Sequence, residues 1–559
     1  MQQEITQAIR EALQTLGLTD VAFVVDHPTD TNTDADYFSN VAMAAAKQAG
    51  KPPRDIAAEI VDAIGPQSFV TEVAGPGFLN FTLPRGFFVE RLKAAIEAGD
   101  NWGKNDSWSG KKVIVEYTDP NPFKEFHVGH LFSNAVGESI ARLFIMNRAD
   151  TKRVNYQGDV GLHVAHAIWG IQKLQAVAGD AKSLTLTPEV LGKAYALGAT
   201  AYKNKEDDAV TEIRAINKAV YERSDEEINK LYDLGRKVSL EYFETIYRTL
   251  GTSFDEYFFE SEAGPKGKEL VISNPEVFVE SDGARVFMGE DHGLHTRVFL
   301  NKEGLPTYEA KELALAKMKE DRLGKYDHSV ISTGGEIIEY FKVLKKAMSF
   351  VYPELEKKTE HIGHGMVRLT GGKMSSRTGD VIAAKDFIDE VADAAKEKLT
   401  EPNDVLAKDI AIAAIKYTTL KGSILQDSGF DKERALSFEG DSGPYLQYTH
   451  ARICSVLTKA AQAGVGASFE RPPEKAYEVE KLVYQFEEVV KESLQERAPH
   501  KVTHYLTELA GAFNSFYGNE KIADSSDEYA PYKAAVSVAV RQTLKNGLWI
   551  LGIKAPEKM

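Results

Sequence analysis

Two histidines three positions apart, His127 and His130, are the residues of this sequence whose types and spacing most suggest chemistry. They follow a β-branched run at 113–117 that predicts a buried strand, and they precede an apolar pattern at helical spacing that begins at Leu131. The first turn of a helix carries unpaired N–H groups and the positive end of the helix dipole, so it attracts phosphate. Imidazoles there can donate to phosphate oxygens, and Gly129 lets a flat base approach the backbone. The spacing alone is also compatible with a zinc site or with two surface histidines.

A second candidate phosphate site is the loop 371–380, in which two glycines precede Lys373. Glycine lets the backbone approach a ligand closely, and lysine offers a compact cation for a polyphosphate. Taken alone, a loop of this composition is also typical of a solvated turn. The loop becomes a stronger candidate because the same chain also contains the histidine pair.

Metal chemistry has weaker support. His163 and His166 form a second pair at the same spacing, but a helix face that lines a cleft is the favoured interpretation of it. The single cysteine, Cys454, rules out an internal disulfide and any multi-cysteine zinc or iron–sulfur site. We therefore expect no metal site built by the protein.

The composition is that of a large globular protein. With 559 residues the chain is too long for one hydrophobic core, so several domains are expected. The net charge of −16 argues against non-specific coating of nucleic acid, although a local basic groove would be hidden in the sum. The N-terminal residues resemble neither a secretory signal nor a transit peptide, and no apolar run approaches the roughly 18 residues of a membrane span. We expect a cytoplasmic protein.

The elements that must position these residues fall into three regions. Residues 1–108 predict a small α+β module. In residues 109–399, strands alternate with helices as in a doubly wound parallel sheet, with a charged helical insertion at about 187–250. Residues 400–559 show apolar residues at spacings of three and four, which predicts an all-α domain. The predicted class is therefore a multidomain α/β protein, with the histidine pair at the carboxyl edge of its sheet.

Several long motifs, in the correct order, resemble those of arginyl-tRNA synthetases of class I. The first signature of that family is similar to VEYTDPNPFKEFHVGHL, and the second, a KMSKS-type loop, is similar to GGKMSSRTGDVI. The end of the family's next strand resembles VNYQGDVG, its N-terminal domain resembles DADYFSNVAMAAAK and VAGPGFLNF, and its C-terminal domain resembles GPYLQYTHARICSVL and LKNGLWILGIKAPEKM. The resemblance implies a Rossmann-like catalytic domain, an α+β N-terminal domain that contacts tRNA, and an α-helical anticodon-binding domain.

The resemblance also implies an arginine–tRNA ligase that works in two steps. Arginine and ATP, which brings Mg²⁺, give arginyl-adenylate and pyrophosphate; the arginyl group then moves to the terminal ribose of tRNA(Arg). The expected partners are L-arginine, ATP and that tRNA, and the protein is expected to be a monomer with no membrane partner. A class I synthetase of the lysine type and a catalytically silent, tRNA-binding paralogue are the alternatives.

The ATP site implied by the resemblance comprises His127, Gly129, His130, Lys373, Met374 and Ser375. His127 and His130 match histidines that contact ATP phosphates, and Lys373 matches a lysine that draws on the departing pyrophosphate. This sequence departs from the general second signature, which has another lysine where Ser376 stands. Lys124, three residues ahead of His127, is expected to supply the missing cation.

Recognition of guanidinium needs carboxylates in a fixed planar arrangement, because the group presents a fork of N–H donors. The positions that match the family's arginine pocket are Asn121, Asp150, Asn155, Glu260, Tyr308 and Glu312. Without the resemblance, each of these acids would be interpreted as a solvated surface residue. Glu312 replaces a more usual aspartate and Ile337 a more usual glutamine, two departures that fall on one wall of the pocket.

For the tRNA, the resemblance points to one stretch of the last domain. Tyr445, Tyr448 and Arg452 are expected to contact the anticodon, because unpaired bases are stacked on aromatic rings and hydrogen-bonded. His450 suits that chemistry as well. We expect half of this set to be buried in the domain core instead.

Overall fold

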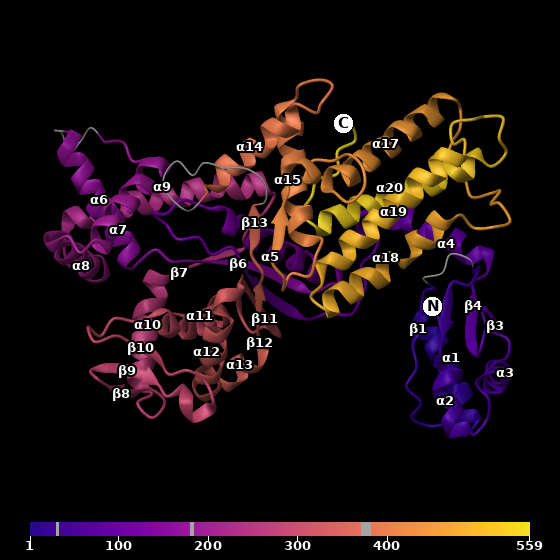
Figure 1. The fold of residues 1–559 in the computed structure, drawn as a ribbon, viewed down its shortest axis with the longest axis horizontal. Coiled ribbons are helices and arrows are strands. Elements are labelled where there is room, and N and C mark those ends of the chain that lie inside the picture. The colour runs from indigo at the N-terminus through magenta and orange to yellow at the C-terminus, as the bar shows by residue number, and fades with distance from the viewer. Residues whose placement is uncertain (29–32, 179–183, 370–381) are drawn as a thin grey trace. The chain divides into compact units, whose positions relative to one another are not determined.

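The computed structural model describes residues 1–28, 33–178, 184–369 and 382–559 (Figure 1). The chain forms two compact units: unit 1 contains 1–102, 456–485 and 512–542, and unit 2 contains 103–455, 486–511 and 543–559. Both units receive residues from the C-terminal helices α17 (Gly443–Gln462), α18 (Glu478–Gln495), α19 (Pro499–Asn519) and α20 (Ala530–Ile550). In the part of the chain that is described, no helix has both the length and the apolar character needed to cross a membrane.

Unit 1 is an α+β unit built on an antiparallel sheet of order β1-β2-β4-β3. The strands are β1 (Val25–Asp26), β2 (Tyr37–Ser39), β3 (Val70–Ala74) and β4 (Phe78–Thr82). The helices that the N-terminal residues contribute are α1 (Gln2–Thr15), α2 (Val41–Ala49), α3 (Pro53–Ile64) and α4 (Arg85–Ala98), followed by the 3-10 turn η1 (Gly99–Asn101). Ile5, Ile9 and Leu13 lie on the buried face of α1, as their helical spacing requires. The α+β class expected for this region is confirmed.

The C-terminal helices complete the core of unit 1. Tyr484 of α18 is buried in the same apolar cluster as the N-terminal helices. Arg85 pairs with the buried carboxylate of Glu480 through two N–O contacts of 2.9 and 3.1 Å, and the Tyr532 hydroxyl donates to the same carboxylate at 2.6 Å. A bidentate pair of this kind fixes orientation as well as adding energy. The N-terminal residues and the C-terminal helices therefore share one core.

The parallel sheet of unit 2 determines where a site can form. Its order is β12-β11-β5-β6-β7, and every neighbouring pair is parallel. The strands are β5 (Lys112–Glu116), β6 (Asp150–Gln157), β7 (Glu256–Phe259), β11 (His328–Gly334) and β12 (Thr359–His364). The chain winds from β5 outward to β7 and then returns to place β11 on the other side of β5, so the reversal lies between β5 and β11. Ligands of open α/β sheets bind at the carboxyl edge beside such a reversal. The predicted doubly wound sheet is confirmed.

Helices and two small sheets accompany this parallel sheet. The helices are α5 (Val128–Met146), α6 (Leu162–Ala178), α7 (Pro188–Lys203), α8 (Asp207–Glu222), α9 (Glu226–Leu250), α10 (Glu260–Ser273), α11 (Tyr308–Leu323), α12 (Ile338–Val351), α13 (Pro353–Lys358), α14 (Ala384–Lys396), α15 (Asp404–Leu420) and α16 (Lys432–Ala435). Figure 1 shows α7 and α8 beside α6 and α9. The remaining strands are β8 (Val279–Ser281), β9 (Ala284–Phe287), β10 (Arg297–Leu300), β13 (Val367–Leu369) and β14 (Ser428–Phe430), and the 3-10 turns are η2 (Gly289–His292) and η3 (Gly335–Ile337).

Candidate functional site

A cavity of about 960 Å³ opens at the carboxyl edge of the parallel sheet. Its walls come from the ends of β5, β6 and β11, the first turns of α5, α10 and α11, and the segment after β12. The sequence-predicted residues that line it are Asn121, His127, Gly129, His130, Glu260, Tyr308, Ile337 and Glu312. The predicted Lys373, Met374 and Ser375, and Ser376 beside them, lie outside the described residues.

The loop from β5 to α5 has an unusual backbone. Thr118, Asp119 and Phe123 all have positive φ, at 81°, 41° and 67°. Residues other than glycine rarely adopt this conformation, and such local strain collects at functional sites. Neighbours hold the loop in place: the Phe123 N–H donates to Ser239 Oγ at 2.9 Å, and the Tyr156 N–H donates to Asp119 Oδ1 at 2.8 Å. The sequence forms this loop at the cost of local strain, which tertiary contacts offset.

The two histidines cap the start of α5 through their own side chains. His127 Nδ1 accepts the Gly129 N–H at 3.1 Å, and His130 Nδ1 accepts the His127 N–H at 3.2 Å. Burial lowers the pKa of both imidazoles, with a further contribution from the charge of Lys124. A neutral imidazole whose Nδ1 accepts a hydrogen bond carries its proton on Nε2. Both rings therefore keep an Nε2–H donor at the N-terminus of a helix, where an anion is attracted.

Lys124 lies close enough to these rings to affect them electrostatically. Its charge contributes to lowering the pKa of His127, His130, His163 and His166, and its ammonium lies 4.9 Å from the centre of the Tyr195 ring. Lys124 is not among the described residues that line the cavity. It adds positive potential beside the imidazole pair.

Described residues on both sides of 370–381 lie in the cavity wall or beside the imidazoles. Val367, before it, lines the cavity. After it, the Ile382 carbonyl accepts the Val128 N–H at 3.1 Å, and the Ala384 N–H donates to the Phe126 carbonyl at 2.7 Å. Val367 therefore lies in the cavity wall, and Ile382 and Ala384 lie beside the start of α5.

Three carboxyl groups that line the cavity lie close enough to influence one another electrostatically, and we call them the acid corner: Glu116, Asp119 and Glu312. Burial raises the pKa of both Asp119 and Glu312 well above the ordinary range, and the nearby charge of Glu116 raises it further. Tyr156 and Tyr340 line the same wall, and burial also raises the pKa of these phenols, which stay neutral donors. An acid corner beside open space is a site for a cationic group.

Sequence reasoning missed Glu116 and Asp119. Glu116 falls within the run 113–117 that predicts a buried strand, and Asp119 lies directly after it. The signal was present, because the last residue of a parallel strand and the loop after it lie at the edge where ligands bind.

A glycine in the cavity wall, Gly158, brings two predicted residues together. A Cβ added to Gly158 would lie 2.2 Å from Asn121 Oδ1 and 3.3 Å from Glu260 Oε1, so only glycine allows this approach. Glu260 is buried and pairs with Lys311 at 2.5 Å. Burial raises the pKa of the Glu260 carboxyl, against the lowering effect of Lys311. Tyr308 covers the same region with a largely exposed ring.

Two predicted arginine contacts need correction. Asp150 is the first residue of β6, pairs in register with Lys112, and is exposed at the amino edge of the sheet, opposite the cavity. Asn155 is fully buried; its Nδ2 donates to the Tyr117 carbonyl at 2.9 Å, and its Oδ1 accepts from Gln157 at 2.7 Å. Asn155 therefore holds the backbone that leads into the loop and does not line the cavity.

The second histidine pair also lies off the cavity lining. His163 Nε2 contacts the Gly158 carbonyl at 2.7 Å, and burial lowers the pKa of His163 to about 3. The His166 ring lies 5.1 Å from the Tyr202 ring, on the side of the helical insertion. In the described ranges, no group of three or more His, Cys, Asp or Glu side chains is arranged to hold a metal. The pair belongs to the packing of α6.

The stretch predicted to contact tRNA lies on α17. Arg452 places its guanidinium 4.7 Å from the ring of the exposed Tyr448, one turn away. Tyr445 is half-buried, while His450 is buried and its Nδ1 contacts the Pro556 carbonyl at 2.9 Å. Tyr448 is thus the exposed member of this set, Tyr445 and Arg452 are half-buried, and His450 belongs to the interior.

Comparison with known proteins gives the same family along the whole chain. A family model described as "tRNA synthetases class I (R), catalytic domain" matches residues 92–432. Models described as "Arginyl tRNA synthetase N terminal domain" and "DALR anticodon binding domain" match residues 3–83 and 446–559.

Full-length relatives agree with these models. The chain is 30% identical to the arginine–tRNA ligase of Clostridioides difficile (strain 630) over 577 residues, covering 99% of both chains. It is 32% identical over 540 residues to that of Clostridium perfringens (strain 13 / Type A), covering 93% of this chain and 94% of the relative. Among solved structures, the arginyl-tRNA synthetase of Thermus thermophilus superposes with a TM-score of 0.78 at 24% identity, covering 100% of both chains. The arginyl-tRNA synthetase of Plasmodium falciparum superposes with a TM-score of 0.79 at 20% identity, covering 100% of this chain and 99% of that chain.

Proposed function

This chain belongs to the arginyl-tRNA synthetase family of class I, and on that premise we propose how its carboxyl-edge cavity brings arginine and ATP together. Its activity is the ligation of arginine to tRNA with consumption of ATP. The arginyl family sets aside the lysine-type alternative, and the presence of His127, His130 and Lys373 argues against a silent paralogue. The observation that carries our proposal is the presence, in one cavity, of two imidazole donors and an acid corner.

We assign the imidazole end to ATP. The arginine carboxylate attacks the α-phosphate, negative charge develops on the phosphate oxygens, and donors already in place stabilise it. The Nε2–H groups of His127 and His130, with the N-terminus of α5, supply these donors. Lys124 and Lys373 add cations, and Mg²⁺ arrives bound to ATP as part of the substrate. Met374 and Ser375 are assigned to the same ATP contacts from their place beside Lys373, and Gly129 is assigned to the face of adenine.

We assign the acid corner to the guanidinium of arginine. Glu116, Asp119 and Glu312 approach it from two elements, so a planar group with several N–H donors can be held from more than one side. Ile337 offers no hydrogen bond on this wall, and Asp119 supplies an additional carboxylate there. The α-amino and carboxylate end of arginine then lies near Asn121 and Glu260, toward the imidazoles.

We further propose that tRNA meets the protein through two regions. Residues 400–559 would receive the anticodon, with Tyr448 and Arg452 stacking on unpaired bases and Tyr445 behind them. Residues 1–108 would contact the body of the tRNA, and residues 109–399 would carry the chemistry. We expect the enzyme to act as a monomer in the cytoplasm.

One exchange assay tests the proposal. Arginine-dependent exchange of pyrophosphate into ATP is expected with cognate tRNA(Arg) present and not without it, as the family resemblance implies. Lysine in place of arginine is expected to give no exchange. Absence of exchange under every condition, with a protein that still binds tRNA, would contradict the assignment of this cavity.

The acid corner also predicts a pH dependence of arginine binding. Because burial raises the pKa of Asp119 and Glu312 in the empty pocket, a guanidinium must displace protons that these carboxyls hold. The KM for arginine is therefore expected to fall as pH rises through the raised pKa values. Calorimetry in two buffers of different ionisation enthalpy would measure the proton release directly.

A stability measurement tests the direction of this pH dependence. A carboxyl whose pKa is raised by folding stabilises the protein at low pH, and this contribution is lost as pH rises through the folded-state pKa. Bound arginine restores this stabilisation by pairing with the ionised carboxylates. The increase in Tm caused by saturating arginine should grow with pH in the parent protein and less steeply in Glu312→Gln. A pH-independent increase in Tm, without proton release, would show that these carboxyls do not titrate on binding.

A further inference from the structure

A buried lysine lies behind the acid corner. Lys319 is only 1% exposed, and its Nζ lies 2.7 Å from Glu116 Oε2. It stands on α11 seven residues after Glu312, which two helical turns place on the same face. Burial disfavours its ammonium, but the charge and hydrogen bond of Glu116, with smaller contributions from Tyr326 and Glu312, together raise the pKa of Lys319 above its ordinary value. A charged ammonium therefore faces the acid corner from the protein side.

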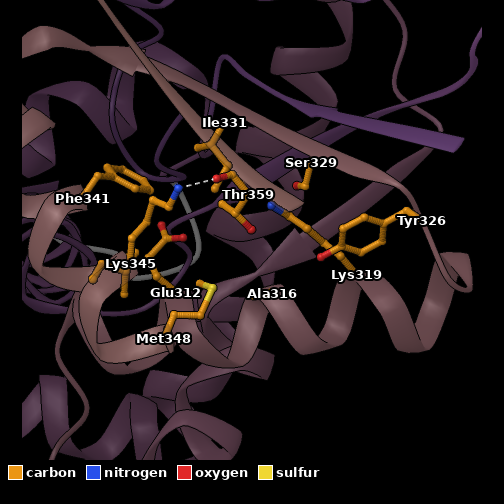
Figure 2. Close-up of a pocket in the computed structure, with 11 residues that line it drawn as sticks. Glu312, Ala316, Lys319, Tyr326, Ser329, Ile331, Phe341, Lys345, Met348 and Thr359 are labelled. Atoms are coloured by element: carbon orange, nitrogen blue, oxygen red, sulfur yellow. Dashed lines mark hydrogen bonds between the residues drawn. The ribbon is translucent and has the colours of Figure 1, made fainter. Parts of the chain in front are cut away.

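A small closed cavity surrounds this ammonium. Its volume is about 10 Å³, and its lining includes Glu312, Lys319, Tyr326, Ser329, Lys345 and Thr359. Figure 2 shows the Lys319 ammonium directed toward Ser329 and Thr359, with Glu312 across the space. Glu312 and Phe341 line both this cavity and the large one, so they form part of the wall between them. Lys319 thus acts on the acid corner from behind and does not enter the substrate space.

The titratable and charged groups that face Lys319 come from every element packed against it. They are Glu116 of β5, Asp119 of the following loop, Glu312 of α11, Tyr326 before β11 and Lys345 of α12. In both Asp119 and Glu312, the charge of Lys319 lowers the pKa against the larger raising effects of burial and of Glu116. Lys319 is therefore a resident cation for all three acids.

Stability alone does not account for such a lysine. A buried ion pair costs desolvation that its attraction only partly offsets, and apolar residues of similar size are often equally stable in its place. For two carboxyls of the corner, Asp119 and Glu312, burial and the charge of Glu116 raise the pKa. The third, Glu116, is the one that Lys319 contacts directly.

We propose that Lys319 is a positioning residue for arginine, which pairs with the buried Glu116 carboxylate and holds it oriented toward the guanidinium before the substrate arrives. This inference rests on the assignment of the acid corner to the guanidinium. Without Lys319, the cluster of carboxyls has no resident cation, and the lowering effect of that cation on the pKa of Asp119 and Glu312 is lost. Arginine must then bind to carboxyls that hold their protons more tightly.

The test compares Lys319→Met and Lys319→Arg with Glu116→Gln, by steady-state kinetics across the neutral pH range. In Lys319→Met, the KM for arginine is expected to rise about 10- to 50-fold, as expected for losing one charge-assisted hydrogen-bond partner, with the KM for ATP unchanged. The KM for arginine should also fall more steeply with rising pH than in the parent. Lys319→Arg should restore most of the affinity, since it keeps the charge.

A double variant removes both charges and protects the test against misfolding. Because Lys319 acts through Glu116, Lys319→Met with Glu116→Gln should show the same arginine KM as Glu116→Gln alone, within about twofold. If the two substitutions instead multiplied their separate effects on the arginine KM, the inference would be contradicted. So would a Lys319→Met protein with the arginine KM and pH profile of the parent while Glu116→Gln is impaired. An unimpaired Glu116→Gln would overturn the arginine pocket itself, and the inference with it.

Discussion

Replacing His130 with asparagine should lower the rate of arginyl-adenylate formation by a factor on the order of 10² to 10³, the usual effect of removing one preorganised donor from a developing oxyanion. The asparagine oxygen can still accept the His127 N–H that His130 Nδ1 accepts at 3.2 Å, while the Nε2–H donor is lost. The start of α5 is therefore retained and the donor alone is removed. Single-turnover adenylate formation, with arginine, ATP and tRNA saturating, measures the effect.

The matched control is His292→Asn, in the exposed turn η2 away from the cavity, which should keep the parent rate. His130→Ala removes the cap as well as the donor, so its Tm should fall further than that of the asparagine variant. A His130→Asn enzyme that forms adenylate at the parent rate would show that this imidazole does not stabilise the phosphate.

Replacing Glu116 with glutamine should raise the KM for arginine on the order of 100-fold and leave the KM for ATP nearly unchanged. A charge-assisted hydrogen bond to the guanidinium is lost, and the buried ammonium of Lys319, 2.7 Å away, loses its carboxylate partner. Both changes weaken the same corner of the pocket. Initial rates at varied arginine, with ATP and tRNA saturating, give the result.

Glu262→Gln serves as the control for charge, because this carboxylate pairs with Arg322 at 2.6 Å outside the cavity lining. It should leave the arginine KM unchanged. If Glu116→Gln raised the KM for ATP and for arginine equally, Glu116 would be supporting the whole cavity and not the guanidinium.

The sequence predicted the fold better than it predicted the pocket. Alternation of strands and helices determines a doubly wound sheet, because parallel strands need long crossovers. That sheet places the turn after β5, and hence His127 and His130, at its ligand-binding edge. The histidine pair could therefore be located from local spacing together with sheet topology.

The pocket depends on which end and which face of a strand each residue occupies. Asp150 could have been excluded, because VNYQGDVG, 154–161, contains the end of the strand and Asp150 precedes it, on the amino side. Glu116 was hidden in a strand whose neighbours are apolar. Lys319 and Lys311 could not be recognised as buried in a charged helix such as α11, because their partners, Glu116 and Glu260, come from other elements. Such pairs are tertiary facts, which no periodicity encodes.

The shared core of unit 1 has a consequence for synthesis on the ribosome. Residues 1–102 emerge first, yet Tyr484, Glu480 and Tyr532, which complete their core, are translated in the last part of the chain. A nascent chain folds from its N-terminus at the pace of elongation. Residues 1–102 therefore keep part of their apolar surface unburied until the catalytic region and the helices after it have been synthesised. Folding of its two ends is coupled to completion of translation.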